Sequence, residues 1–235
     1  IPFNLNWNRN FNEQIKKTTK LQLKKLNFNL KNESLLKNEK YYSTIETNIR
    51  NSRIMFDYQI LEDLIIFKSN YSKLTNDDIK FEGSISSDPF YLDLNIDLKT
   101  LNLSKLLSFG TIFNELLKTN LFFNKNLSAD ISLNSKKITK NKLFDKSKIF
   151  LRFNNGKINF DTSYFVSEKI GVLDLYKSSL ENINNELFFF GSFDFKIKKE
   201  NQFYSTFQIP KNNRRKTKNI YFDIEYNLFS DELNI

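Results

Sequence analysis

Apolar and polar residues alternate along most of this chain. The clearest stretch covers positions 90–99, where Phe, Leu and Ile fill every second position and Tyr, Asp, Asn and Lys fill the others. Because successive side chains of a β-strand point to opposite sides, the pattern predicts a strand with one apolar and one polar face. The same alternation predicts strands at 26–30, 54–60, 79–85, 127–133, 149–153, 158–160, 187–197 and 220–228. Strands with one polar face are typical of antiparallel sheets, so we expect a mainly β fold.

The turn signals agree with antiparallel pairing. Asn154-Asn155-Gly156 separates two predicted strands, and Asn-Gly is the strongest short hairpin signal because the central residues of such a turn need positive φ. Ser86-Ser87-Asp88-Pro89 forms a second break. Gly83 and Gly191 fall inside predicted strands, where each indicates a bulge or the close approach of a neighbouring group.

Two segments have helical spacing. Positions 104–119 place Leu and Phe three and four residues apart after a Ser that can cap a helix, which predicts an amphipathic helix. A short helix is predicted at about 202–208, before Pro210. Segment 31–42 is ambiguous between helix and loop. No linker composition divides the chain, so we expect 1–235 to be one continuous sheet segment, with a possible division into 1–122 and 123–235.

Composition removes most enzyme classes. The 235 residues include no Cys and no His, which excludes disulfides, the usual zinc and iron–sulfur ligand sets, thiol nucleophiles and imidazole bases. The five Gly form neither a phosphate loop nor a dinucleotide fingerprint. Asp93 and Asp97 share a polar strand face about 13 Å apart, too far for a glycosidase pair. We therefore expect no catalytic residue, no metal and no cofactor.

The chain is basic, with a net charge of +9. Part of this reflects heavy use of Asn, Lys, Ile, Phe and Tyr, as in proteins from AT-rich genomes. The best cluster is the run 211–218, in which Arg214, Arg215 and Lys216 are predicted to contact anionic groups, either lipid headgroups or RNA phosphates. The alternative is a solvated loop that discourages strand pairing.

The apolar strand faces must be covered by something. A second sheet is one possible cover; the other possibility is a curved sheet whose apolar face forms an open groove or trough for a ligand. In the groove interpretation, the lining residues are Phe90, Leu92, Leu94, Ile96, Leu98, Leu151, Phe153, Ile158, Phe160, Leu187, Phe189, Phe193, Phe195, Ile220, Phe222 and Ile224.

Three segments carry a resemblance to a known family. They are FEGSISSDPFYLDLNIDLKTLNLSKLLS (81–108), LFDKSKIFLRFNNGKINFDTSYFVSEKIGVLDLYKSSL (143–180) and FFFGSFDFKIKKENQFYSTFQIPKNNRRKTKNIYFDIEYNLFSDELNI (188–235). Their order is a strand led by Pro, a Leu-rich helix, an N-G-K-I-N-F hairpin, a G-x-F-x-F strand, a short helix, a Pro with a basic turn, and a final strand. This order resembles the C-terminal region of the AsmA-like proteins, a family related to TamB.

The resemblance implies a long antiparallel sheet folded into a trough with an apolar lumen. It further implies a periplasmic protein, anchored in the inner membrane by a helix outside this fragment, that carries phospholipid to the outer membrane without a chemical step. The chain starts at Ile1 and contains no run of about 18 apolar residues, which fits a piece of such a protein. The family offers no catalytic residue. It leaves the protein partners at the ends of the groove unknown.

Two other functions stay open. The basic charge also suits an RNA-binding or ribosome-associated protein, although nucleic acid is the less favoured partner. Alternating strands also occur in outer-membrane β-barrels, but the predicted helix at 104–119 and the irregular strand lengths argue against that class.

Overall fold

The computed structural model describes residues 3–10, 16–24, 27–37, 40–49, 52–74, 77–102, 122–228, 230 and 232–235. The chain divides into two compact units, 1–99 and 100–235, and each is described by itself. Both are built from antiparallel strands, and the prediction of a mainly β, antiparallel fold is confirmed. The predicted organisation of 1–235 as one continuous segment stays a prediction.

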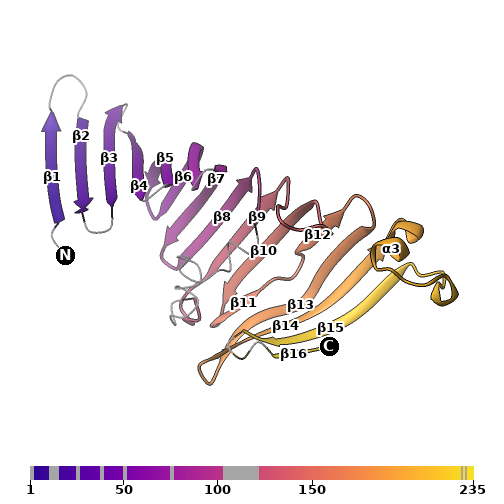
Figure 1. The fold of residues 1–235 in the computed structure, drawn as a ribbon. Coiled ribbons are helices and arrows are strands. Elements are labelled where there is room, and N and C mark those ends of the chain that lie inside the picture. The colour runs from indigo at the N-terminus through magenta and orange to yellow at the C-terminus, as the bar shows by residue number, and fades with distance from the viewer. Residues whose placement is uncertain are drawn as a thin grey trace. The chain divides into compact units, whose positions relative to one another are not determined.

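Unit 1–99 is an antiparallel meander (Figure 1). Each of its strands pairs with the next in sequence. The strands are β1 (Phe3–Asn10), β2 (Lys16–Leu23), β3 (Phe28–Lys37), β4 (Lys40–Ile49), β5 (Ser52–Leu61), β6 (Leu64–Leu74), β7 (Asp77–Ser87) and β8 (Phe90–Leu98). The described residues of segment 31–42, which is ambiguous in the sequence, belong to the β3–β4 pair.

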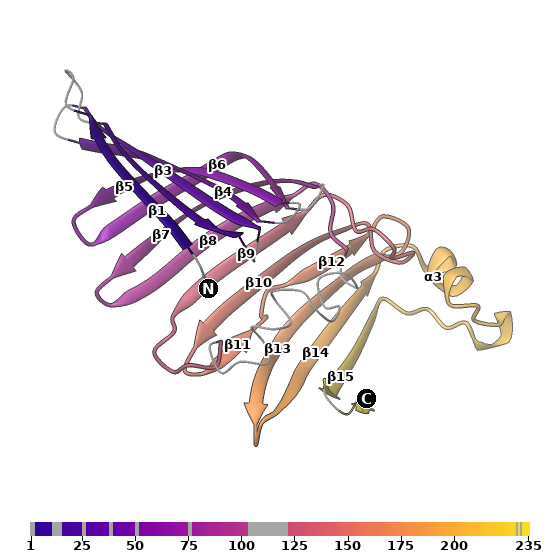
Figure 2. The ribbon, with the colours of Figure 1, turned by 60° about the vertical axis from the view of Figure 1, so that its left-hand side comes forward.

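Unit 100–235 contains the remaining strands and the described helices (Figure 2). They are β9 (Ala129–Ser135), β10 (Lys146–Asn154), β11 (Lys157–Asn159), β12 (Tyr164–Ser167), β13 (Gly171–Ile183), β14 (Glu186–Ile197), α3 (Glu200–Thr206), the 3₁₀ turn η2 (Lys211–Asn213), β15 (Asn219–Asn227) and β16 (Glu232–Asn234). The short strands β11 and β12 each pair with β10 on one side and with β13 on the other.

Two local predictions are confirmed, and one cannot be compared. Asn155 and Gly156 have φ of 54° and 75°, as the tight β10–β11 turn requires. The short helix exists, two residues earlier than predicted, as α3. The predicted helix at 104–119 lies outside the described residues.

Bulges occur in strands that lack the predicted glycines. The β14–β15 register runs through Gly191 without a shift, and the β7–β8 register does the same through Gly83. On the other side of β14, the β13–β14 register shifts opposite Gly191, because Ser192 pairs with Tyr176 and Phe190 pairs with Ser179. The shifts lie in β6, between Ser69 and Ser72, and in β13, between Tyr176 and Ser179. Gly83 thus marks a close approach, while Gly191 lies opposite the β13 bulge and close to the rings of Phe189 and Phe193.

Where strand pairing is interrupted, serine hydroxyls form hydrogen bonds with the backbone groups that have no strand partner. Opposite the β6 bulge, the amide of Met55 donates to Ser72 Oγ at 2.8 Å, and this hydroxyl lies 3.0 Å from the Met55 carbonyl. In the gap between β11 and β12, Ser163 Oγ accepts from the Phe150 amide at 2.8 Å and donates to its carbonyl at 3.3 Å. Both serines are fully buried. Each hydroxyl thus replaces two ladder hydrogen bonds that no strand supplies.

The two units differ in their cores. In 1–99, Ile79 is the one buried apolar residue among those described. Unit 100–235 has a conventional core, in which Ile170, Phe195, Phe203 and Tyr204 form a cluster beneath α3. The other buried apolar residues of this unit are Leu101, Ala129, Ile138, Leu151, Phe153, Ile158, Leu175, Leu180, Leu187 and Phe193.

Candidate functional site

The strand register places most of the apolar side chains of 1–99 on one side of the sheet, which we call the first apolar face. Cross-strand partners such as Phe81 and Ile96, or Ile65 and Ile85, point to the same side. The described members are Leu5, Leu21, Leu23, Phe28, Leu30, Leu36, Tyr41, Ile45, Ile54, Phe56, Tyr58, Ile60, Ile65, Phe67, Ile79, Phe81, Ile85, Phe90, Leu92, Leu94, Ile96 and Leu98. The five predicted lining residues of β8 all belong to this face.

The opposite side of the same strands carries the ion pairs. Lys16 and Lys31 each lie 3.0 Å from the carboxylate of Glu33, and the pairs Arg53–Glu46 and Lys68–Glu82 are 2.8 Å apart. The hydrogen bonds from Lys31 and then Lys16 lower the pKa of Glu33 below its usual range. The ion pairs of 1–99 therefore share one side of the sheet, the charged side, which also carries the exposed apolar residues Leu61, Leu64 and Ile66.

Aromatic rings form the centre of the first apolar face. Phe56 contacts Phe67 and Phe81 with ring centroids 6.0 and 5.8 Å apart, and Tyr58 lies 6.4 Å from Phe56. Phe67 lies over Gly83, where a Cβ would come within 2.8 Å of the Phe67 ring. The glycine thus lets one ring lie flat against the sheet.

No second layer covers this face among the described residues of 1–99. Each described strand makes its substantial contacts with its neighbours in the sheet. Leu5, Ile60 and Phe90 are 59%, 57% and 45% exposed, and the predicted residues Leu92, Leu94, Ile96 and Leu98 are half-buried. Among the described residues of this unit, the face is an open apolar surface.

Polar groups interrupt the first apolar face on β3–β5. Ser43 donates to Ser34 at 2.8 Å, and the Tyr58 hydroxyl donates to Asn32 Oδ1 at 3.2 Å. Two open hollows of about 660 and 310 Å³ are lined mainly by residues of the charged side, such as Glu33. The apolar lumen expected for a trough therefore stays a prediction.

Unit 100–235 has an equivalent second apolar face. The register of β10, β11, β14 and β15 places their predicted lining residues on one side: Leu151, Phe153, Ile158, Leu187, Phe189, Phe193, Phe195, Ile220, Phe222 and Ile224. Phe160 joins them through a ring contact with Phe189 at 5.7 Å. The opposite side carries the pairs Arg152–Asp130, Lys157–Glu181 and Lys196–Asp174.

Protein covers much of the second apolar face. Leu151, Phe153, Ile158, Leu187, Phe193 and Phe195 are buried. Phe122 packs on Phe153 at 5.4 Å, and α3 covers Phe195 through Phe203 at 5.9 Å. Five predicted residues are only half-buried: Phe160, Phe189, Ile220, Phe222 and Ile224. Ile220 also packs against the cluster under α3, so the accessible part centres on Phe189, Phe222 and Ile224.

The three predicted anion-contacting residues lie on the exposed loop that follows α3. Arg214 Nε donates to the Ile209 carbonyl at 3.0 Å, and its guanidinium lies 5.5 Å from the centre of the Tyr204 ring. The Tyr204 hydroxyl donates to the carbonyl of Arg215. Arg214 and Arg215 thus fix the loop through backbone and ring contacts, while their charges stay in solvent.

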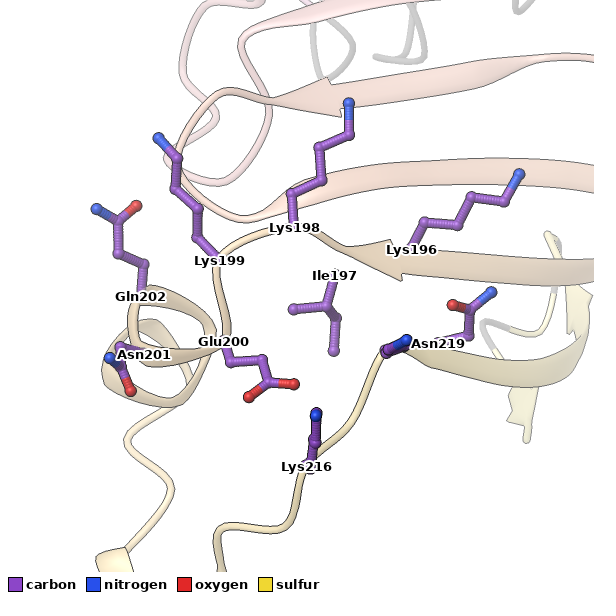
Figure 3. Close-up of a pocket in the computed structure, with 10 residues that line it drawn as sticks. Lys196, Ile197, Lys198, Lys199, Glu200, Asn201, Gln202, Lys216 and Asn219 are labelled. Atoms are coloured by element: carbon purple, nitrogen blue, oxygen red, sulfur yellow. The ribbon is translucent and has the colours of Figure 1, made fainter.

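Lys216 lines an open cleft of about 970 Å³ at the end of β14, together with Lys218 of the same predicted run. The cleft also holds three basic residues that the sequence analysis did not predict: Lys196, Lys198 and Lys199. Figure 3 shows Lys198 and Lys199 on the side of the cleft away from Lys216. Glu200 lies between Lys216 and these two lysines. The hydrogen bond with Asp174 raises the pKa of Lys196. The sequence signal for these lysines is the K-I-K-K run at the end of a predicted strand. The β14–β15 pairing brings Lys196 opposite Asn219, and therefore close to the end of the basic run 211–218.

The described residues contain no group of three carboxylates able to hold a metal ion. Nor does any described helix have the length and apolarity needed to span a membrane. Searches of protein-family models, curated proteins and solved structures found no match to this chain.

Proposed function

We propose that this chain is a non-enzymatic lipid-binding segment whose apolar sheet faces hold phospholipid acyl chains. In the full proposal, which follows the AsmA-like resemblance, it belongs to a periplasmic protein anchored in the inner membrane. That protein moves phospholipid between the two membranes of a Gram-negative envelope.

The open first apolar face is the observation that carries the proposal. A sheet normally buries its apolar side against another layer, and contiguous exposed apolar surface marks an interaction site. Here Ile79 is the one buried apolar residue described in 1–99, while large side chains such as Ile60 and Phe90 are about half exposed. An acyl chain lying on this face supplies the missing cover.

The charged side of the sheet favours this arrangement. Three cross-strand ion pairs and the Lys31–Glu33 pair within β3 lie on the side opposite the first apolar face. Such exposed pairs contribute little to stability, but they keep that side hydrated.

The energetics explain why an apolar face would assist lipid movement. Burying one methylene contributes about 0.8 kcal/mol, so transferring a 16-carbon chain into water costs on the order of 12 kcal/mol. A continuous apolar surface removes most of that cost, because the tail exchanges one apolar contact for another. No bond is made or broken.

Site-specific photocrosslinking tests the proposal. A photoreactive residue at Leu94 or Ile224 should form adducts with phospholipid, detected by mass spectrometry after incubation with radiolabelled or defined lipid. Asp93 and Glu225 are matched controls, since each lies next to the probe position on the opposite side of the same strand. Equal adduct yields at the apolar and polar positions would refute acyl-chain binding to these faces.

A further inference from the structure

Positive charge is concentrated in the excursion between β14 and β15. This segment, residues 198–218, is called the basic arm. It contains seven Lys and Arg residues and one acidic residue, Glu200, so it carries +6 of the chain's net +9. Figures 1 and 2 show α3 and the following loop extending beyond the ends of β13 and β14.

The cations of the basic arm are available to an external anion. All seven are exposed: Lys198, Lys199, Lys211, Arg214, Arg215, Lys216 and Lys218. None forms an ion pair with a described residue, and Lys199 Nζ donates to a carbonyl, that of Glu168, at 2.9 Å. On the sheet, by contrast, lysines such as Lys157 and Lys196 face carboxylates.

An exposed aromatic ring accompanies these cations. Phe207 is 46% exposed at the end of α3, and its ring is held against Phe203 at a centroid distance of 4.8 Å. Phe203 and Tyr204 are buried in the cluster with Ile170 and Phe195, which fixes α3 to the sheet. The basic arm therefore presents a supported apolar side chain among unpaired cations.

We propose that the basic arm is a docking surface for an anionic phospholipid bilayer, with the cations at the headgroups and Phe207 in the interface. Juxtaposed cations and an aromatic or aliphatic anchor are the combination that holds proteins at such surfaces. The cleft itself is not a closed phosphate site, since Glu200 lies between Lys216 and the lysines of β14's end. The inference does not rest on acyl-chain binding by the sheet, because it concerns the surface of an intact bilayer.

Vesicle flotation with the whole 235-residue chain tests this docking. The protein should float with vesicles of phosphatidylcholine mixed with phosphatidylglycerol and not with phosphatidylcholine alone. The triple variant Arg214→Gln, Arg215→Gln, Lys216→Gln should lose affinity on the order of 100-fold at low salt, since each cation contributes about fivefold at an anionic surface. Phe207→Ser should lose about tenfold at any salt concentration, because its contribution is apolar.

Matched variants separate docking from general charge and from unfolding. Lys136→Gln, Lys142→Gln and Lys169→Gln together remove three exposed cations elsewhere in the same unit and should change flotation little. Circular dichroism confirms that each variant is folded.

Three outcomes would overturn the proposal: flotation that is independent of phosphatidylglycerol, equal losses in the two triple variants, or binding of single-stranded RNA in place of vesicles. None of these bears on crosslinking at Leu94, so failure of docking and failure of acyl-chain binding are distinguishable.

Discussion

Removing the hydroxyl of Ser163 should destabilise unit 100–235 substantially. Ser163 is 1% exposed, and its Oγ satisfies both the amide and the carbonyl of Phe150 in the gap between β11 and β12. Ser163→Ala leaves these two buried backbone groups without partners and hardly changes the packing. An unsatisfied buried group costs about 1–3 kcal/mol, so we expect a loss of about 2–4 kcal/mol in the free energy of unfolding.

Ser132→Ala is the matched control. Ser132 is 5% exposed on the neighbouring strand β9, and its hydroxyl has no hydrogen-bond partner in the structure described. Replacing that hydroxyl removes a buried polar atom without breaking a hydrogen bond. The free energy of unfolding should therefore stay unchanged or rise slightly.

Urea denaturation followed by far-UV circular dichroism measures both variants. The midpoint of Ser163→Ala should fall clearly below that of the wild type, and the midpoint of Ser132→Ala should not. If the two variants unfold at the same urea concentration, serine hydroxyls do not replace the missing ladder bonds, and the reasoning is wrong. Ser72→Ala applies the same test to unit 1–99, with a smaller expected loss because Ser69 Oγ also contacts the Met55 carbonyl.

Further expectations concern backbone packing and ionisation. Gly171→Ala should lower the urea midpoint more than Gly191→Ala, because the new Cβ would collide with the Lys196 carbonyl at the first site and only with phenylalanine rings at the second. Glu33 should titrate below an ordinary glutamate in a carbon-detected NMR experiment, and Lys31→Gln should raise its pKa. Its stabilising contribution should be present above the ordinary glutamate pKa and vanish as the pH falls through the lowered value; an unchanged titration in Lys31→Gln would contradict this.

Alternation was sufficient to locate most strands. Phe90–Leu98 was found because every apolar residue of β8 shares one face, and the β10–β11 turn because Asn155-Gly156 can adopt positive φ. Both signals are local in sequence, so each can be recognised without knowing which strand pairs with which. Which faces would be covered depends on residues far away in sequence, such as Phe122 over Phe153.

Two of the strands that alternation did not locate, β6 and β13, contain bulges. In β6, the run Leu64–Phe67 is apolar at every position, and the bulge between Ser69 and Ser72 then shifts the pattern. In β13, the shift between Tyr176 and Ser179 breaks the alternation in the same way. A bulge moves later residues to the opposite phase, so a period of two cannot be followed through it.

The sequence predicted which residues share the apolar faces, but it did not predict which of them are accessible. The register gathers the predicted lining residues on one face of each unit, but α3 and its cluster close the part around Phe195. Lys196, Lys198 and Lys199 were not predicted as part of the basic cluster, because the β14–β15 pairing is what brings them close to 211–218. Proximity of this kind is a property of the pairing pattern and cannot be read from either run alone.

The simple neighbour-to-neighbour pairing of β1–β8 has an evolutionary consequence. Because each strand depends on the two beside it, a hairpin could be duplicated or lost without rerouting the rest of the chain. Gain or loss of two strands preserves the parity of the alternation, so every remaining side chain keeps its orientation. Such an architecture can change its span by small genetic steps.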